Sequence, residues 1–437
     1  MKIGLYGGMA NNMYVFAKSF VKQGVKTCFI RDRSDHYPFS QPVWEDVRAT
    51  LDYDDVAKAS SWSWQEWKNW EAEVGWKAPD WLADPLEGMT TDGESPRRGI
   101  LFAHLARRHP YRRVVIDLMA NCDCLLVCGI EGTILAKMSG KPYVIWPHGG
   151  DIRKAAGLQP PQSWHPRIWL NYWLVAWLLR RAYRGALWIG THDPKGIGGH
   201  IGDTTSKFQI EFLGIPLPLR RRLPKEERRK VLADLMKDLG LAEPKADWIG
   251  FIPSRIDFFW KGTDLLFRAI RQWNRGHNLH LIASGWGEDY RKAKEMIPAE
   301  QITFLPCTVS KPILYEFYGA SDFVADQFLL GTYGTAAVEA MSCGTPVMMW
   351  IDEKAFRTRE WTPPPVLNAR GEQEILRLLG AVISGGIDLE AQGQLAQEWV
   401  AKVHRESIVI LQFLARLSER LPALSQDQPC ATKSRAL

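Results

Sequence analysis

The residue types best suited to chemistry gather between positions 319 and 350, in GASDFVADQFLLGTYGTAAVEAMSCGTPVMMW. Their order predicts a short apolar strand, a loop rich in glycine and threonine, a helix at 335–342 and a second apolar strand. A loop that enters a helix offers free backbone N–H groups and the positive end of the helix dipole. The residues predicted to approach a phosphate or a sugar hydroxyl are Gly331, Thr332, Tyr333 and Gly334.

Three polar side chains accompany this loop. Glu339 lies on the following helix among small and apolar residues, where a carboxylate needs a partner, and a pair of ligand hydroxyls would be one. Asp326 and Gln327 end the preceding strand, where parallel sheets collect ligand-binding groups. These two residues either contact a ligand or only cap the strand.

Two cations flank a second loop that leads into a helix. Arg255 follows the apolar strand predicted at 248–252, and Lys261 stands just before the helix that begins near Thr263. Charge-assisted donors beside a helix N-terminus can hold a diphosphate. The alternative is that both are ordinary surface charges.

Two further candidates follow strands in the first part of the chain. His148 comes after the strand predicted at 142–146, and Gly8 lies in GGMANN, after the strand predicted at 2–6. GGMANN lacks the third glycine of a dinucleotide fingerprint, which argues against an NAD-dependent enzyme. His148 either faces a ligand or is satisfied by the backbone of its own loop.

The sequence resembles the C-terminal motif of retaining glycosyltransferases of family 4 (glycosyl transferases group 1). The residues that carry the resemblance are Gly331 to Gly334, Glu339-Ala340-Met341 and Cys343-Gly344-Thr345-Pro346-Val347. The resemblance implies a GT-B fold, in which two Rossmann-like domains face each other across a cleft. In that family two glutamates stand eight positions apart; the first meets the donor sugar and the second holds the ribose. Glu339 matches the second, whereas Gly331 replaces the first. We therefore expect Asp326 or Gln327 to take over part of the sugar contact, with Gly331 opening space.

The resemblance also implies roles for the other candidates. Arg255 and Lys261, with the loop 332–334, would neutralise the leaving diphosphate. His148 would support the transition state at the donor sugar, and Gly8 would face the cleft near the diphosphate or the acceptor. No metal and no cofactor are expected, because the nucleoside-diphosphate sugar is a co-substrate.

The implied function is transfer of a sugar from a nucleoside-diphosphate sugar to an acceptor hydroxyl, with retention, in polysaccharide or glycolipid assembly. One alternative is a non-catalytic nucleotide-sugar-binding protein that has lost the donor-sugar glutamate. Another is a GT-B nucleotide-sugar epimerase, which needs no acceptor.

Composition narrows the class of protein. The 437 residues suit two large domains, and 46% hydrophobic with 24% charged residues is typical of a globular protein. The net charge of +6 is gathered in arginine clusters, which favours anionic partners, although no nucleic acid is expected. We predict neither a signal peptide nor a membrane span. Seven scattered cysteines suit the cytoplasm, and Cys122, Cys124 and Cys128 are expected on one face of a buried strand rather than at a metal.

The predicted domain plan has two parts. Residues 1–215 form an acceptor domain with a tryptophan-rich insertion at about 38–99, and a C-terminal helix at 395–417 completes this domain. Residues 216–394 form the nucleotide-sugar-binding domain. The polar tail at 425–437 is predicted to be disordered.

Two aromatic segments have open interpretations. The insertion carries seven tryptophans, six of them between residues 62 and 81, which either bind the acceptor or pack helices onto the domain. The segment 168–179 carries Trp169, Trp173 and Trp177 on one helical face, with arginines following. It is either a buried helix or one that rests on an anionic membrane, and in the second case the acceptor is a lipid-linked saccharide at the inner face.

Overall fold

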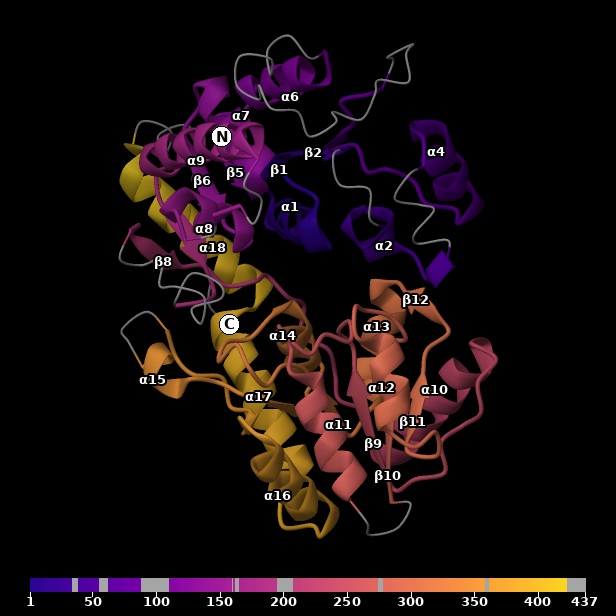
Figure 1. Ribbon diagram of the computed structural model, residues 1–437. Helices are drawn as coiled ribbons and strands as arrows, with labels where there is room; N and C mark the ends of the chain where they lie inside the picture. Colours follow the sequence, from indigo (N-terminus) through magenta and orange to yellow (C-terminus); the bar gives the residue numbers. More distant parts are fainter. Residues whose placement is uncertain are drawn as a thin grey trace, which may run out of the picture.

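The computed structural model describes residues 1–33, 38–54, 62–87, 110–158, 160–161, 165–194, 207–273, 278–357 and 361–422. Two parallel β-sheets, each covered by helices, build two lobes (Figure 1). The N-terminal lobe contains the strands up to residue 212, and the C-terminal lobe contains those from residue 248 onward. The predicted α/β class is confirmed.

The sheet of the N-terminal lobe has seven parallel strands in the order β4-β2-β1-β5-β6-β7-β8. They are β1 (Lys2–Tyr6), β2 (Lys26–Ile30), β4 (Leu82–Ala83), β5 (Cys124–Cys128), β6 (Tyr143–Trp146), β7 (Ile189–Thr191) and β8 (Ile210–Phe212). The helices around this sheet include α1 (Asn12–Lys22), α6 (Pro110–Ala120), α7 (Gly129–Ser139), α8 (Gly150–Ala156) and α9 (Pro166–Gly185). β7 begins only at Ile189, because α9 continues to Gly185.

The sheet of the C-terminal lobe has six parallel strands in the order β11-β10-β9-β13-β14-β15. They are β9 (Trp248–Ile252), β10 (Leu279–Ala283), β11 (Ile302–Phe304), β13 (Phe323–Ala325), β14 (Val347–Met349) and β15 (Leu367–Asn368). The helices include α10 (Lys225–Asp238), α11 (Thr263–Gln272), α12 (Tyr290–Met296), α13 (Lys311–Ala320), α14 (Thr335–Ser342) and α16 (Glu372–Ile383). The β9, β13 and α14 segments lie where the sequence predicts them.

A small two-stranded sheet joins the lobes. β3 (Thr50–Asp52), from the tryptophan-rich insertion, pairs antiparallel with β12 (Cys307–Val309) of the C-terminal lobe. The Tyr53 hydroxyl reinforces this contact, because it lies 3.1 Å from the Leu305 carbonyl oxygen and 3.0 Å from that of Cys307.

The C-terminal helices cross back to the N-terminal lobe (Figure 1). The prediction of one helix at 395–417 is wrong, because the chain forms α17 (Leu389–Val403) and α18 (Glu406–Arg420) with a break at His404. His404 is fully buried and accepts the Ile215 N–H at Nδ1, at 2.8 Å, while its carbonyl accepts the Leu217 N–H. Beyond the break, Phe413 packs against Phe20 of α1, with ring centroids 5.1 Å apart.

The tryptophans of the insertion pack largely on one another. The Trp62 and Trp67 rings lie 4.8 Å apart, and Trp70 lies 6.1 Å from Trp44. β4 closes the insertion by joining the edge of the seven-stranded sheet. This arrangement favours packing onto the lobe, and an acceptor role stays a prediction. Residues 55–61 and 88–99 of the insertion, and the tail at 425–437, lie outside the described residues.

The three clustered cysteines do not share one face. Cys124 and Cys128 belong to the core that continues into the C-terminal lobe, whereas Cys122 packs with Cys28 on the other side of the sheet. Cys122 precedes β5, so strand alternation does not apply to it. The described residues hold no group of three or more His, Cys, Asp or Glu arranged to bind a metal ion.

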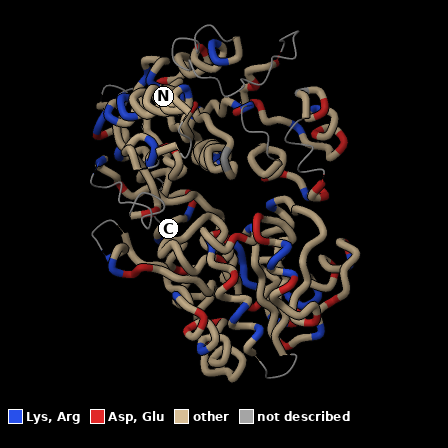
Figure 2. The backbone as a smooth tube through the Cα atoms, in the orientation of Figure 1, with Lys and Arg blue, Asp and Glu red and all other residues tan. Residues whose placement is uncertain are grey.

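α9 has one buried and one exposed face. Its buried residues face α7 and α8, whereas Leu170, Trp173 and Trp177 are 68%, 56% and 49% exposed. The helix has no acidic residue, and Figure 2 marks basic positions along it. None of the described helices is both long enough and apolar enough to cross a membrane.

Candidate active site

The site candidates meet where strands of both lobes end. His148 and His192 follow β6 and β7 of the N-terminal lobe, and Asp326 follows β13 of the C-terminal lobe. The two lobes touch here, because His192 Nε2 lies 3.1 Å from the carbonyl oxygen of Tyr333. The C-terminal ends of parallel strands are where α/β proteins bind ligands.

His148 has an available ring nitrogen. Its backbone N–H donates to Asp151 Oδ1 at 2.9 Å, which fixes the turn into α8. Its Nε2 is buried and has no hydrogen-bond partner within the described chain. Burial lowers the pKa of His148, and Asp151 opposes this effect, so the ring is neutral near pH 7. The interpretation that loop backbone satisfies this histidine does not account for Nε2.

His192 is a neighbour that the sequence did not single out. It is only 8% exposed, and its ring stacks on Trp146 with centroids 5.5 Å apart. Its Nδ1 is buried without a partner among the described residues. Burial lowers the pKa of His192 to about 4, and His148 adds to the lowering. A histidine directly after a three-residue strand carries no pattern that could have identified it.

The glycine-threonine loop leaves its backbone donors free. No acceptor within the described chain pairs with the N–H groups of Thr332, Tyr333 or Gly334. The Thr332 hydroxyl is likewise buried without a partner there. These donors precede α14, so they supply the anion-binding arrangement predicted from the sequence.

Gly331 does not open space for a ligand, and that expectation is wrong. A Cβ at this position would lie 2.9 Å from the Trp350 ring, so the side of the loop on which a side chain would project is already filled. The backbone also has φ +70°, a conformation that side chains disfavour. A glutamate at this position would therefore need both the loop and Trp350 to move.

The Tyr333 side chain faces the core rather than a ligand. Its ring stacks on Phe356, and its hydroxyl lies 3.1 Å from Nε2 of His404 at the break between α17 and α18. Only its backbone N–H remains for a diphosphate. Tyr333 thus connects the loop to the crossing helices.

Lys261 binds both polar candidates at the end of β13. Its ammonium lies 2.9 Å from Asp326 Oδ1 and 3.1 Å from Gln327 Oε1. The Gln327 amide donates to the Thr332 carbonyl, so both ends of Gln327 are engaged. Asp326 is fully buried, and its Oδ2 has no partner in the described structure. Of the two predicted sugar contacts, Asp326 is the one with a free atom.

Arg255 is also paired with a carboxylate. Its Nε and Nη2 donate to Asp257 Oδ2 at 3.0 and 2.9 Å, while the side chain remains 45% exposed. Asp257 in turn accepts the Trp260 N–H through Oδ1, which fixes the loop before α11. The second Nη group of Arg255 is left for an anion.

Glu339 has partners within the protein. Lys311 forms an ion pair with its Oε1, and the Tyr318 hydroxyl donates to Oε2 at 3.2 Å. The partner that a buried carboxylate needs is thus supplied by the protein, and the ribose contact of Glu339 stays a prediction. Glu45, from the insertion, approaches this pair and has a buried Oε1 without a partner among the described residues.

Gly8 precedes an unusual turn. Its carbonyl accepts the Asn11 N–H at 2.9 Å, and Ala10 and Asn11 both have positive φ, 51° and 52°. Asn11 is held by its amide, which donates to the Gln41 carbonyl at 2.8 Å. Non-glycine residues in this conformation are uncommon and often mark functional sites.

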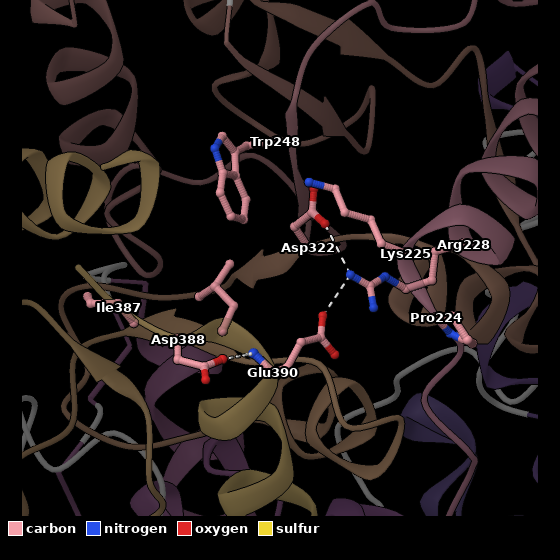
Figure 3. Close-up of a pocket in the computed structure, with 9 residues that line it drawn as sticks. Pro224, Lys225, Arg228, Trp248, Asp322, Ile387, Asp388 and Glu390 are labelled. Carbon is pink, nitrogen blue, oxygen red and sulfur yellow. Dashed lines mark hydrogen bonds and ion pairs between the residues drawn. The ribbon is translucent and has the colours of Figure 1, made fainter. Parts of the chain in front are cut away.

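A cavity of 390 Å³ lies elsewhere, at the other end of the C-terminal sheet (Figure 3). Trp248, which begins β9, and Asp322, which precedes β13, line it. Arg228 inside it binds Asp322 and Glu390, at 3.3 and 2.8 Å. This cavity is separate from the candidate site, which lies at the opposite ends of the same strands.

Comparison with protein families gives one match. Residues 225–350 match the model of the family described as glycosyl transferases group 1. The match contains Arg255, Lys261, Asp326, the loop 331–334 and Glu339. No curated protein matches the sequence.

Solved structures with the same fold are numerous. HepE of Anabaena in complex with UDP-glucose is 16% identical, with 96% of this chain and 100% of that chain covered and a TM-score of 0.58. Sucrose-phosphate synthase of Thermosynechococcus elongatus is 13% identical, with 97% and 100% covered and a TM-score of 0.60. The catalytic domain of starch synthase IV of Arabidopsis thaliana, bound to ADP and acarbose, is 12% identical, with 96% and 99% covered and a TM-score of 0.57.

These likenesses confirm the predicted GT-B fold. The family match adds that residues 225–350 are similar to glycosyl transferases group 1, which supports a glycosyltransferase.

Proposed function

We propose that the protein is a retaining glycosyltransferase that moves a sugar from a nucleoside-diphosphate sugar to an acceptor hydroxyl. The observation that carries this proposal is a set of buried polar atoms without partners in the described chain, in segments that follow strands of both lobes. They are His148 Nε2, Thr332 Oγ1 and Asp326 Oδ2. Buried polar groups are normally hydrogen-bonded, so several together call for a polar ligand.

The diphosphate would lie against the loop 332–334 and the start of α14, with Lys261 and Arg255 beside it. Lys261 keeps one donor beyond those given to Asp326 and Gln327, and Arg255 keeps one Nη group. These donors would stabilise the charge that grows on the leaving group, so the reaction needs no bound metal. Glu339 would accept hydrogen bonds from the ribose hydroxyls, and these bonds would partly replace the one that it accepts from the Tyr318 hydroxyl.

The reaction would form a bond between the acceptor oxygen and the anomeric carbon while the bond to the diphosphate oxygen breaks. The acceptor proton would pass to the departing diphosphate oxygen on the same face, so the anomeric configuration is kept. His148 Nε2 and Asp326 Oδ2 would hold the sugar hydroxyls during this step. When the sugar binds, each of these two atoms gains the hydrogen-bond partner that the described chain does not give it. This gain favours the sugar-bound state.

A membrane-bound acceptor fits the exposed face of α9. Leu170, Trp173 and Trp177 form a contiguous apolar surface, and the exposed Arg181 and Arg184 follow on the same side of the helix. Aromatic and basic residues in this arrangement bind the interface of anionic membranes. We propose that this face rests on the inner side of a membrane and that the acceptor is a lipid-linked saccharide of a polysaccharide or glycolipid.

A non-catalytic nucleotide-sugar-binding protein is the second candidate, favoured by the filled space at Gly331. Release of nucleoside diphosphate from a panel of UDP-, ADP- and GDP-sugars separates the two functions. A transferase or hydrolase releases it from at least one donor, whereas a binding protein shows affinity without release. Conversion of the donor to its epimer, with no release, would identify an epimerase.

A further inference from the structure

His192 has two ring nitrogens with different tasks. Its Nε2 faces the carbonyl oxygen of Tyr333 at 3.1 Å, and a carbonyl only accepts, so Nε2 carries the proton. The neutral ring then has an unprotonated Nδ1, which can only accept a hydrogen bond. That Nδ1 is buried and has no donor among the described residues.

The ring is held rigidly, so this acceptor is pre-positioned. Trp146 stacks on one face with an interplanar angle of 26°, and Tyr333 contacts the ring at a centroid distance of 5.2 Å. Both contacts come from elements at the candidate site, namely the end of β6 and the loop before α14. Burial keeps the pKa of His192 at about 4, so Nδ1 remains a lone-pair acceptor throughout the neutral range.

The position fits a ligand at the loop 331–334. His192 bonds the carbonyl of the loop whose N–H groups would hold the diphosphate, and His148 is near enough to His192 to lower the pKa of His192. No side chain can project from Gly331 here, because Trp350 fills that space. An acceptor for sugar hydroxyls must therefore come from another element.

We propose that His192 contacts the donor sugar, with Nδ1 accepting a hydrogen bond from one of its hydroxyls. This inference rests on the proposed function, and it adds a second residue of the N-terminal lobe, beside His148, to donor-sugar recognition. The alternative is a purely structural histidine that only ties the loop to β7.

Two substitutions separate these roles. His192→Gln places an amide N–H near the position of Nε2, so it keeps the bond to the Tyr333 carbonyl and loses the Nδ1 acceptor. His192→Asn places a carbonyl oxygen near Nδ1, so it keeps the acceptor and loses the bond to Tyr333. Titration calorimetry with UDP and UDP-glucose, and with ADP and ADP-glucose, measures the contribution of the sugar for each protein, and the melting temperature reports folding.

We expect His192→Gln to weaken binding of the preferred nucleotide sugar by roughly five- to tenfold while leaving the nucleoside diphosphate unchanged. His192→Asn should keep the gain in affinity that the sugar provides. The inference is overturned if His192→Gln binds the nucleotide sugar normally, or if it loses sugar and diphosphate affinity equally. If the unmodified protein binds none of these four ligands, and neither GDP nor a GDP-sugar, the proposed function fails first.

Discussion

Lys261 and Asp326 form an ion pair of 2.9 Å at the end of β13, between the two ligand groups that the site is expected to hold. Lys261, the cation proposed to bind the diphosphate, is thus directly paired with Asp326, the carboxylate proposed to accept hydrogen bonds from the donor sugar. Asp326 attracts Lys261 and would repel a nearby phosphate, so the pair sets a balance between holding the sugar and holding the diphosphate.

Substitutions at this pair should act in opposite directions on nucleoside diphosphate binding. Lys261→Ala removes a charge-assisted donor and leaves Asp326 less neutralised, so we expect roughly 10- to 150-fold weaker binding, corresponding to about 1.5 to 3 kcal/mol. Asp326→Asn removes the repulsion, so the diphosphate should bind as well as before or better, while sugar turnover falls at least tenfold. Calorimetry and turnover assays measure both effects.

Arg268→Ala is the matched control, since Arg268 pairs with Asp264 on the exposed side of α11. Arg255→Ala should resemble Lys261→Ala. Unchanged diphosphate affinity in both Arg255→Ala and Lys261→Ala would remove the diphosphate assignment.

Glu339 should contribute both to stability and to nucleotide binding. Glu339→Gln leaves Lys311 buried with less compensation, and breaking a buried pair costs roughly 3 to 5 kcal/mol. Adding Lys311→Met removes the unpaired charge, so the double variant should regain much of the stability without regaining nucleotide affinity. Chemical denaturation and calorimetry separate the two quantities. A double variant that binds nucleoside diphosphate like the unmodified protein would make Glu339 purely structural.

The stability of the protein should fall between about pH 5 and pH 8 because of Glu45. Burial raises the pKa of Glu45 to about 7; Lys311 opposes the rise and Glu339 adds to it. The folded state therefore keeps a proton that the unfolded chain loses near pH 4 to 5, and this stabilisation disappears as the pH passes 7. Glu45→Gln should raise the free energy of unfolding at pH 8 by on the order of 2 kcal/mol.

Denaturation curves at pH 5 and pH 8 test this prediction. The difference between the variant and the unmodified protein should be small at pH 5 and large at pH 8. Equal differences at both values would show that Glu45 does not titrate in this range.

Vesicle binding should depend on the exposed face of α9. We expect the protein to float with vesicles containing anionic lipid at low salt, and each basic residue near the surface contributes about 1 kcal/mol. The variant Trp173→Ser/Trp177→Ser should lose most of this binding. Leu411→Ser is the control, since Leu411 is a comparably exposed apolar residue on α18. Failure of the unmodified protein to bind at low salt would rule out the membrane proposal.

The local pattern of the sequence was enough to predict α14, β9 and the loop between β13 and α14. It was also enough to place Arg255 and Lys261 in the loop between β9 and α11, because that placement depends only on the neighbouring residues. The partners of Glu339 were out of reach, since Lys311 stands 28 positions earlier and reaches it only through packing of α13 on α14. The Trp350 ring, which fills the space beside Gly331, is likewise brought there by tertiary packing that the local sequence does not show.

Long-range packing also explains the other differences. The break between α17 and α18 depends on His404 receiving backbone groups from the segment at 215–217, nearly two hundred positions away. His192 became visible only when β7 met the loop of the other lobe. In each case a helix or strand pattern specified the element, and a distant partner decided its ending or its role.

Donor-dependent release of nucleoside diphosphate would show directly whether this chain transfers sugar from a nucleotide donor. The unmodified protein and His148→Ala would be compared over UDP-, ADP- and GDP-sugars, with nucleoside diphosphate affinity measured for both. We predict release from at least one donor by the unmodified protein, and a fall of at least tenfold in His148→Ala with diphosphate affinity preserved. Tight diphosphate binding without release from any donor would contradict the account.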